Sequence, residues 1–149
     1  MTRYSFLPLL LALITPTAWS LEALEGWMRA LPPGQPTGAA YMTLRNTGSA
    51  PVVVVGASSP AAQRVEIHQS SQVDGMWRMV RLQNLEIAPG ATVTLAPGGT
   101  HLMLFGLKAS PRPGDGVSLN LELAGGDTLA VDITVLAPGS DTSDTHHHH

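Results

Sequence analysis

Residues 117 to 123 read Val117-Ser118-Leu119-Asn120-Leu121-Glu122-Leu123, with an apolar side chain at every second position. Side chains of a β-strand point alternately to its two faces, so this period of two is typical of a strand with one buried and one solvated face. Seven further short runs rich in Val, Leu, Ile or Thr are separated by turn residues. They are Tyr41 to Arg45, Val52 to Ala57, Arg64 to Gln69, Met76 to Leu82, Thr92 to Leu95, His101 to Phe105 and Thr128 to Val135. About eight short strands without a helical period predict an all-β fold, a Greek-key sandwich or small barrel.

The N-terminal residues 1–20 differ from the segment 21–136, which we expect to form one domain. Arg3 is followed by a mostly apolar run that ends near Ala18 and contains Pro8 and Pro16. This run is shorter than the roughly 20 residues that span a bilayer, so it predicts a cleaved signal peptide and export to the periplasm, with no stable membrane insertion after cleavage. Residues 21–30 look like a short mixed segment and not like a strand.

The C-terminal residues 137–149 are polar and end in four histidines, His146, His147, His148 and His149. We expect a disordered His-rich tail. Clustered imidazoles favour Cu(II), so the four histidines are a candidate secondary Cu(II) site. The sequence leaves open whether this run is native or the remnant of a purification tag.

Composition removes several classes of function. The chain has a formal net charge of -3, with 13% charged and 44% apolar residues, which argues against nucleic-acid binding. It contains no cysteine, which excludes disulfides, thiolate nucleophiles and a blue-copper electron-transfer site.

Only two histidines lie outside the tail, His68 and His101. On a strand, His101 and Met103 point to one face while Leu102 and Leu104 point to the other. The sequence therefore predicts a His and a Met side by side on one strand. Phe105 shares the parity of this pair, so the same face is also a candidate packing surface.

A second His and Met pair is predicted on a hairpin. Asp74-Gly75 is a strong signal for a two-residue turn, which pairs Val73 with Met76 and places Arg81 opposite His68. In this register Met79 is the diagonal neighbour of His68 on the same face. The alternation also predicts that Met76, Val80 and Leu82 are buried.

Two imidazoles and two thioethers favour Cu(I) over zinc or the hard divalent cations, because thioether sulfur suits a soft monovalent ion. We therefore predict one Cu(I) site formed by His68, Met79, His101 and Met103. The sequence shows no nucleophile elbow and no paired-carboxylate cluster, so we do not expect an enzyme. A plain immunoglobulin-like interaction module that binds no metal is the alternative interpretation.

The same residues carry a resemblance to a known family. His68, ten residues, Met79, twenty-one residues, His101, one residue and Met103 resemble the signature of the periplasmic copper-A chaperone family, the PCuAC domain. The segments Gly38 to Gly48 and Pro97 to Leu107 also resemble family segments. Many members have a Met directly after the first His, where this chain has Gln69.

The resemblance implies a cupredoxin-like barrel and a copper chaperone. It implies delivery of Cu(I) to the copper-A centre in subunit II of cytochrome c oxidase, either alone or alongside a Sco-type protein. Copper buffering or detoxification in the periplasm is the alternative use of the same site.

Overall fold

The computed structural model describes residues 20–140, which form ten β-strands. The strands are β1 (Leu21–Arg29), β2 (Thr37–Asn46), β3 (Val52–Ser58), β4 (Arg64–Val73), β5 (Met76–Arg81), β6 (Leu85–Ile87), β7 (Thr92–Leu95), β8 (Thr100–Phe105), β9 (Gly116–Leu123) and β10 (Thr128–Leu136). The all-β prediction is confirmed, and each of the eight predicted runs lies on a strand except for Leu82, which follows the end of β5. The strand number is ten and not eight, because β1 and β6 were not predicted. Residues 20–140 contain no helix that is long and apolar enough to cross a membrane. The predicted signal peptide, apart from Ser20, and the terminal histidines lie outside the described residues.

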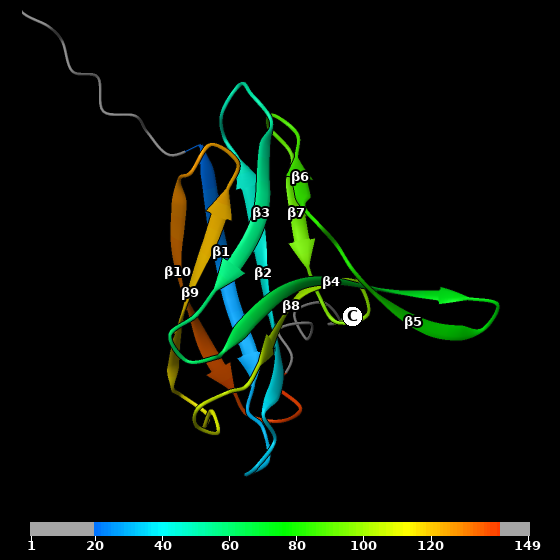
Figure 1. Cartoon of the computed structure of the whole chain (residues 1–149), viewed down its shortest axis with the longest axis vertical. Helices are drawn as coiled ribbons and strands as arrows, with labels where there is room; N and C mark the ends of the chain where they lie inside the picture. Colours follow the sequence, from blue (N-terminus) through cyan, green and yellow to red (C-terminus); the bar gives the residue numbers. More distant parts are fainter. Residues whose placement is uncertain (1–19, 141–149) are drawn as a thin grey trace, which may run out of the picture.

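The sheet closes on itself around one apolar core (Figure 1). Hydrogen-bonded pairs run in the order β4, β8, β2, β1, β10, β9 and β3, and the pair Ala57 and Val65 then joins β3 back to β4. The inward side chains are almost all Leu, Ile, Val and Met, among them Leu102, Leu104 and Leu119. Strand β5 pairs with β4 on the edge opposite to β8 and extends the sheet away from the barrel.

Strand β1 differs from the mixed segment that the sequence predicts there, because its alternation of side chains is interrupted. The register with β2 shifts by one residue between Leu24 and Trp27, and Glu25 adopts a positive φ of 53°. After this bulge Met28 points into the core, while Trp27 points to the other face and is covered by Tyr41, with 4.6 Å between the ring centroids, so both adjacent residues are buried. A pattern of period two is therefore absent from a strand that lies between β2 and β10.

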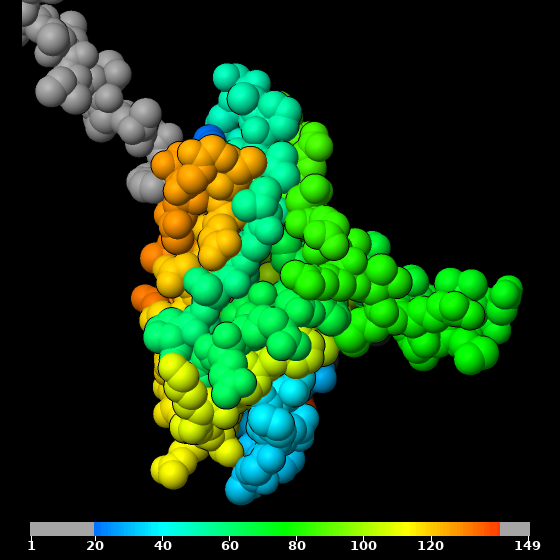
Figure 2. All heavy atoms as spheres, in the orientation of Figure 1, coloured from blue at the N-terminus to red at the C-terminus, as the bar shows by residue number. Residues whose placement is uncertain are grey.

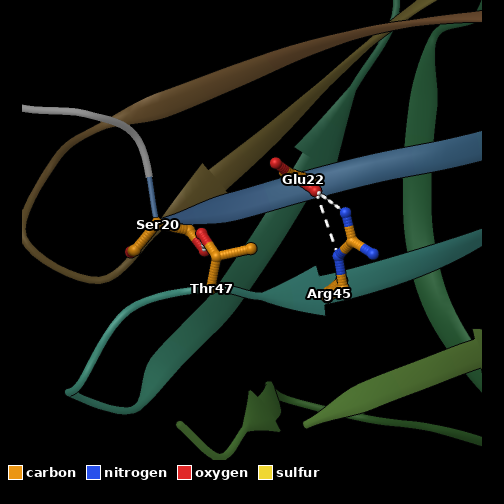
Figure 3. A network of polar contacts seen from close by, with 4 residues as sticks. All are labelled: Ser20, Glu22, Arg45 and Thr47. Atoms are coloured by element: carbon orange, nitrogen blue, oxygen red, sulfur yellow. Dashed lines mark hydrogen bonds and ion pairs between the residues drawn. The ribbon is translucent and has the colours of Figure 1, made fainter. Parts of the chain in front are cut away.

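The beginning of β1 is fastened to the end of β2 by a polar network (Figure 3). Arg45 donates through Nε to Oε2 of Glu22 at 3.1 Å, and the main-chain N–H of Thr47 donates to the carbonyl oxygen of Ser20 at 2.7 Å. Glu22 and Arg45 are register partners and are about half exposed. An exposed ion pair of this kind contributes between about 0 and 1 kcal/mol to folding stability, so it adds little to the stability of the fold.

The β4–β5 hairpin projects from the barrel as an arm (Figures 1 and 2). Its turn has the predicted form, since Asp74 and Gly75 both have positive φ, 52° and 75°, and Val73 pairs with Met76. The burial predicted for β5 is wrong: Met76 is 64% exposed and Val80 is 55% exposed. Only Leu82, just after the strand, packs partly against the core. Alternation separates the two faces of the hairpin, but within the described residues no second layer of strands covers either face of its outer part.

Candidate metal centre

The two predicted histidines are direct cross-strand neighbours. In the β4–β8 pair His68 lies opposite His101, and their ring centroids are 6.1 Å apart. Ile67 and Leu102, which point to the opposite face, are buried in the core. The period of two therefore fixes both imidazoles on the outer face of the barrel wall, as the sequence predicted.

Met103 belongs to the same cluster by position. It lies on β8 between His101 and Phe105, and all three share one face. The His68 ring is 6.1 Å from the His101 ring and 5.9 Å from the Phe105 ring, so it leans over the stretch of β8 that carries Met103. The structure thus brings His68, His101 and Met103 together on two adjacent strands.

Met79 lies apart from this cluster, on the arm. It pairs with Ser70, so it is the diagonal neighbour of His68, as predicted. Its side chain is 51% exposed. Met103 pairs with Glu66, so Met79 and Met103 are separated by two strand spacings and four residues along β4. On a flat sheet this corresponds to about 10 Å across and about 13 Å along the strands. Only the twist or bending of the hairpin could bring the sulfur of Met79 to a shared ion.

Both imidazoles are held by hydrogen bonds. Nε2 of His68 lies 2.8 Å from Oε2 of Glu66, and Nδ1 of His101 lies 3.0 Å from the carbonyl oxygen of Gly99. His101 is 4% exposed and stands 6.3 Å, between centroids, from the ring of Tyr41. The histidines are therefore more enclosed than an outer-face position alone suggested.

Glu66 was not among the predicted site residues, although its position two residues before His68 places it on the same face. One oxygen accepts from His68, and the other lies 2.8 Å from Nε of Arg64 and 3.7 Å from Nη1 of Arg81. The hydrogen bond with His68 holds the pKa of the Glu66 carboxyl below its ordinary value, and Arg81 and Arg64 act in the same direction. The carboxylate thus carries its negative charge beside the two imidazoles with compensation from two guanidinium groups.

The donor set fits a soft metal ion. Nδ1 of His68 is buried and has no hydrogen-bond partner in the described part of the chain, which leaves a lone pair free in the cluster. No group of three His, Asp or Glu side chains that could hold a metal occurs in residues 20–140. A metal ion bound here would need a ligand of another type, and Met103 carries a thioether on the same face of β8.

The fold is that of cupredoxin-like PCuAC domains. The copper-bound PCuAC domain from PmoF2 superimposes with a TM-score of 0.67 at 23% identity, over 80% of this chain and 95% of that one. The apo-DR1885 protein from Deinococcus radiodurans gives a TM-score of 0.63 at 30% identity, over 92% and 95% of the two chains. The Cu(I) form of DR1885 gives 0.59 at 32% identity, over 81% of each chain. The expected PCuAC resemblance is confirmed in the fold.

The chain belongs to the LpqE-like family. The sequence model described as "Putative lipoprotein LpqE-like" matches residues 21–135. The putative lipoprotein Lxx21020 of Leifsonia xyli is 35% identical over 116 residues, which span 77% of this chain and 69% of that protein.

Proposed function

We propose that this protein is an exported copper chaperone that binds one Cu(I) ion through His68, His101, Met103 and Met79. The observation that carries the proposal is the pair of facing imidazoles beside Met103 on one face of the barrel, with Nδ1 of His68 buried and without a hydrogen-bond partner among the described residues. Burying a nitrogen lone pair without a partner is unfavourable, and a bound metal ion removes that cost. The copper-bound PmoF2 domain and Cu(I)-DR1885 support the same assignment.

The chemistry suits a carrier better than a catalyst. Imidazole and thioether ligands are neutral, so they stabilise a monovalent ion without burying net negative charge. Protons do not compete with the ion for a thioether sulfur. Met79 is half exposed on a projecting arm, where a recipient protein can reach it. Transfer would proceed by exchange of one ligand at a time, with Met79 the first to be replaced.

The arm also offers a surface for the recipient. Trp77 is 66% exposed and shares the face of Met79, while Arg78 and Arg81 give the arm positive charge in a chain whose formal net charge is -3. Exposed apolar side chains beside a site are typical of interaction surfaces. We propose the copper-A centre in subunit II of cytochrome c oxidase as the recipient, with a Sco-type protein as a further partner, and the periplasm as the compartment. The relative named a putative lipoprotein supports export.

A Cu(I) titration under reductant, against a competing chelator, tests the proposal. The chain is truncated after Ala137, which removes the terminal histidines and leaves all ten strands intact. We expect one Cu(I) per chain. His101→Ala should weaken binding by more than the roughly 10- to 100-fold that loss of a ligand's hydrogen-bond partner costs. Stoichiometric binding that His101→Ala leaves unchanged would refute the assigned site, and a truncated chain that binds no Cu(I) would leave a generic interaction module.

A further inference from the structure

The hydrogen bonds of the two histidines determine which nitrogen of each ring is free. A carbonyl oxygen can only accept, so the contact of 3.0 Å between Nδ1 of His101 and the Gly99 oxygen requires the proton to be on Nδ1. A neutral imidazole carries one N–H. His101 therefore presents the lone pair of Nε2.

At His68 the assignment is the opposite. An ionised carboxylate also only accepts, so Nε2 of His68 carries the proton that it donates to Oε2 of Glu66 at 2.8 Å. The lone pair of His68 is then on Nδ1, the atom that is buried without a hydrogen-bond partner in the described residues. The carboxylate acceptor at Nε2 assigns the tautomer, and the nitrogen that is left with the lone pair is the one that no hydrogen bond of the described residues occupies.

Glu66 is itself held in place. Arg64 contacts its second oxygen at 2.8 Å, and the guanidinium of Arg64 lies over the Phe105 ring, 4.4 Å from the centroid. Arg81 approaches the same oxygen from β5. With its second oxygen engaged by two cations, the carboxylate directs its first oxygen to His68 alone.

We infer that Cu(I) is bound by Nδ1 of His68 and by Nε2 of His101, and that Glu66 is the positioning residue that makes this choice at His68. The inference rests on the proposed function, because it assigns atoms within that site. Nδ1 is closer to the main chain than Nε2, so an ion held through Nδ1 would lie nearer to β4 than one held through Nε2. A carboxylate that accepts from the other nitrogen also makes the ligating nitrogen a stronger donor.

Long-range proton–nitrogen NMR on the full chain with ¹⁵N-labelled histidine tests the inference. Signals of His68 and His101 are assigned by comparison with His68→Gln and His101→Gln. Without copper we expect opposite tautomers, with the proton on Nε2 in His68 and on Nδ1 in His101. On addition of Cu(I) under reductant, Nδ1 of His68 and Nε2 of His101 should shift. The same tautomer in both rings, or a copper-induced shift of Nε2 in His68, would overturn the inference.

Glu66→Gln separates positioning from a purely structural role. The amide has one acceptor oxygen, which Arg64 and Arg81 attract, so its NH₂ group should turn to His68. An NH₂ group donates a hydrogen bond and cannot accept one from Nε2 of His68. We expect the His68 tautomer to invert, the His101 tautomer to stay, and Cu(I) affinity to fall by about 10- to 100-fold. Glu22→Gln, which removes another arginine-paired carboxylate far from the site, is the matched control and should change neither signal. An unchanged His68 tautomer in folded Glu66→Gln would contradict the assignment of Glu66.

The outcomes also separate this inference from the function on which it rests. If the wild-type chain binds no Cu(I), the proposed function fails and the inference fails with it. If the chain binds Cu(I) through other nitrogen atoms, only the inference fails.

Discussion

The two halves of strand β4 follow the same alternation of side chains but have different surroundings. Residues 64–69 pair with β8, and their inward side chains Val65 and Ile67 are buried in the core. From Ser70 to Val73 the strand pairs with β5 in the arm, where Val73 is 44% exposed. Alternation specifies which side chains share a face, whereas burial requires a second layer over that face. The candidate site spans this boundary, with three of the proposed ligands at the barrel half and the fourth, Met79, on the arm.

The largest expected difference between the two halves is in folding stability. Leu102→Ala removes a buried side chain directly beneath the histidines and should cost about 2 to 5 kcal/mol of unfolding free energy. Val80→Ala on the arm should change it by less than about 0.5 kcal/mol, because the side chain is already exposed. Urea unfolding of both variants measures this. A comparable loss in Val80→Ala would mean that the arm packs against the barrel.

The next largest effect is expected on copper binding at the barrel half. Met103→Leu replaces a thioether by an apolar group of similar volume, so folding stability should change by less than about 1.5 kcal/mol. Cu(I) affinity should fall beyond the roughly 10- to 100-fold range of an indirect effect, because a ligand is lost. Met42→Leu, in a buried Met that packs in the core, is the matched control and should bind Cu(I) like the wild type. Equal affinities of Met103→Leu and Met42→Leu would exclude Met103 as a ligand.

Much of the candidate site could be predicted because local rules suffice for it. The parity of His101 and Met103 against Leu102 and Leu104 follows from the strand period alone, and the structure has it. The hairpin register follows from Asp74-Gly75, and His68 lies opposite Arg81 as predicted. In both cases a single short-range feature determines the geometry.

The remainder depends on long-range packing, which local patterns do not report. The pairing of His68 with His101 joins residues 33 positions apart, so no turn specifies it. Burial of Met76 was predicted from parity and was wrong, because no strand of residues 20–140 packs over that face of the arm. The roles of Glu66 and of the Gly99 carbonyl become visible only when the imidazole nitrogens have coordinates.

A smaller loss of Cu(I) affinity is expected from the arm. Met79→Leu should weaken binding less than Met103→Leu does, since Met79 is exposed and lies outside the cluster of three. Met76→Leu is the matched control, because Met76 is equally on β5 but points to the opposite face. The same chelator competition measures all three variants. If Met79→Leu weakens binding as much as Met103→Leu, the arm must fold over the ion when copper binds.

The smallest effect is expected from the turn, which acts on copper only through Met79. Gly75 has a φ of 75°, and an alanine there places a Cβ in the left-handed region at a cost of about 1 to 2 kcal/mol. Because the arm carries little of the core, this strain should be relieved by loosening of the hairpin register and not by unfolding of the barrel. Gly75→Ala should therefore lower Cu(I) affinity by no more than Met79→Leu, while Gly75→Asn, which tolerates the turn, should bind like the wild type. Amide hydrogen exchange should show faster exchange only in residues 70–81. A larger loss of affinity in Gly75→Ala than in Met79→Leu would show that the arm holds the barrel half of the site in place.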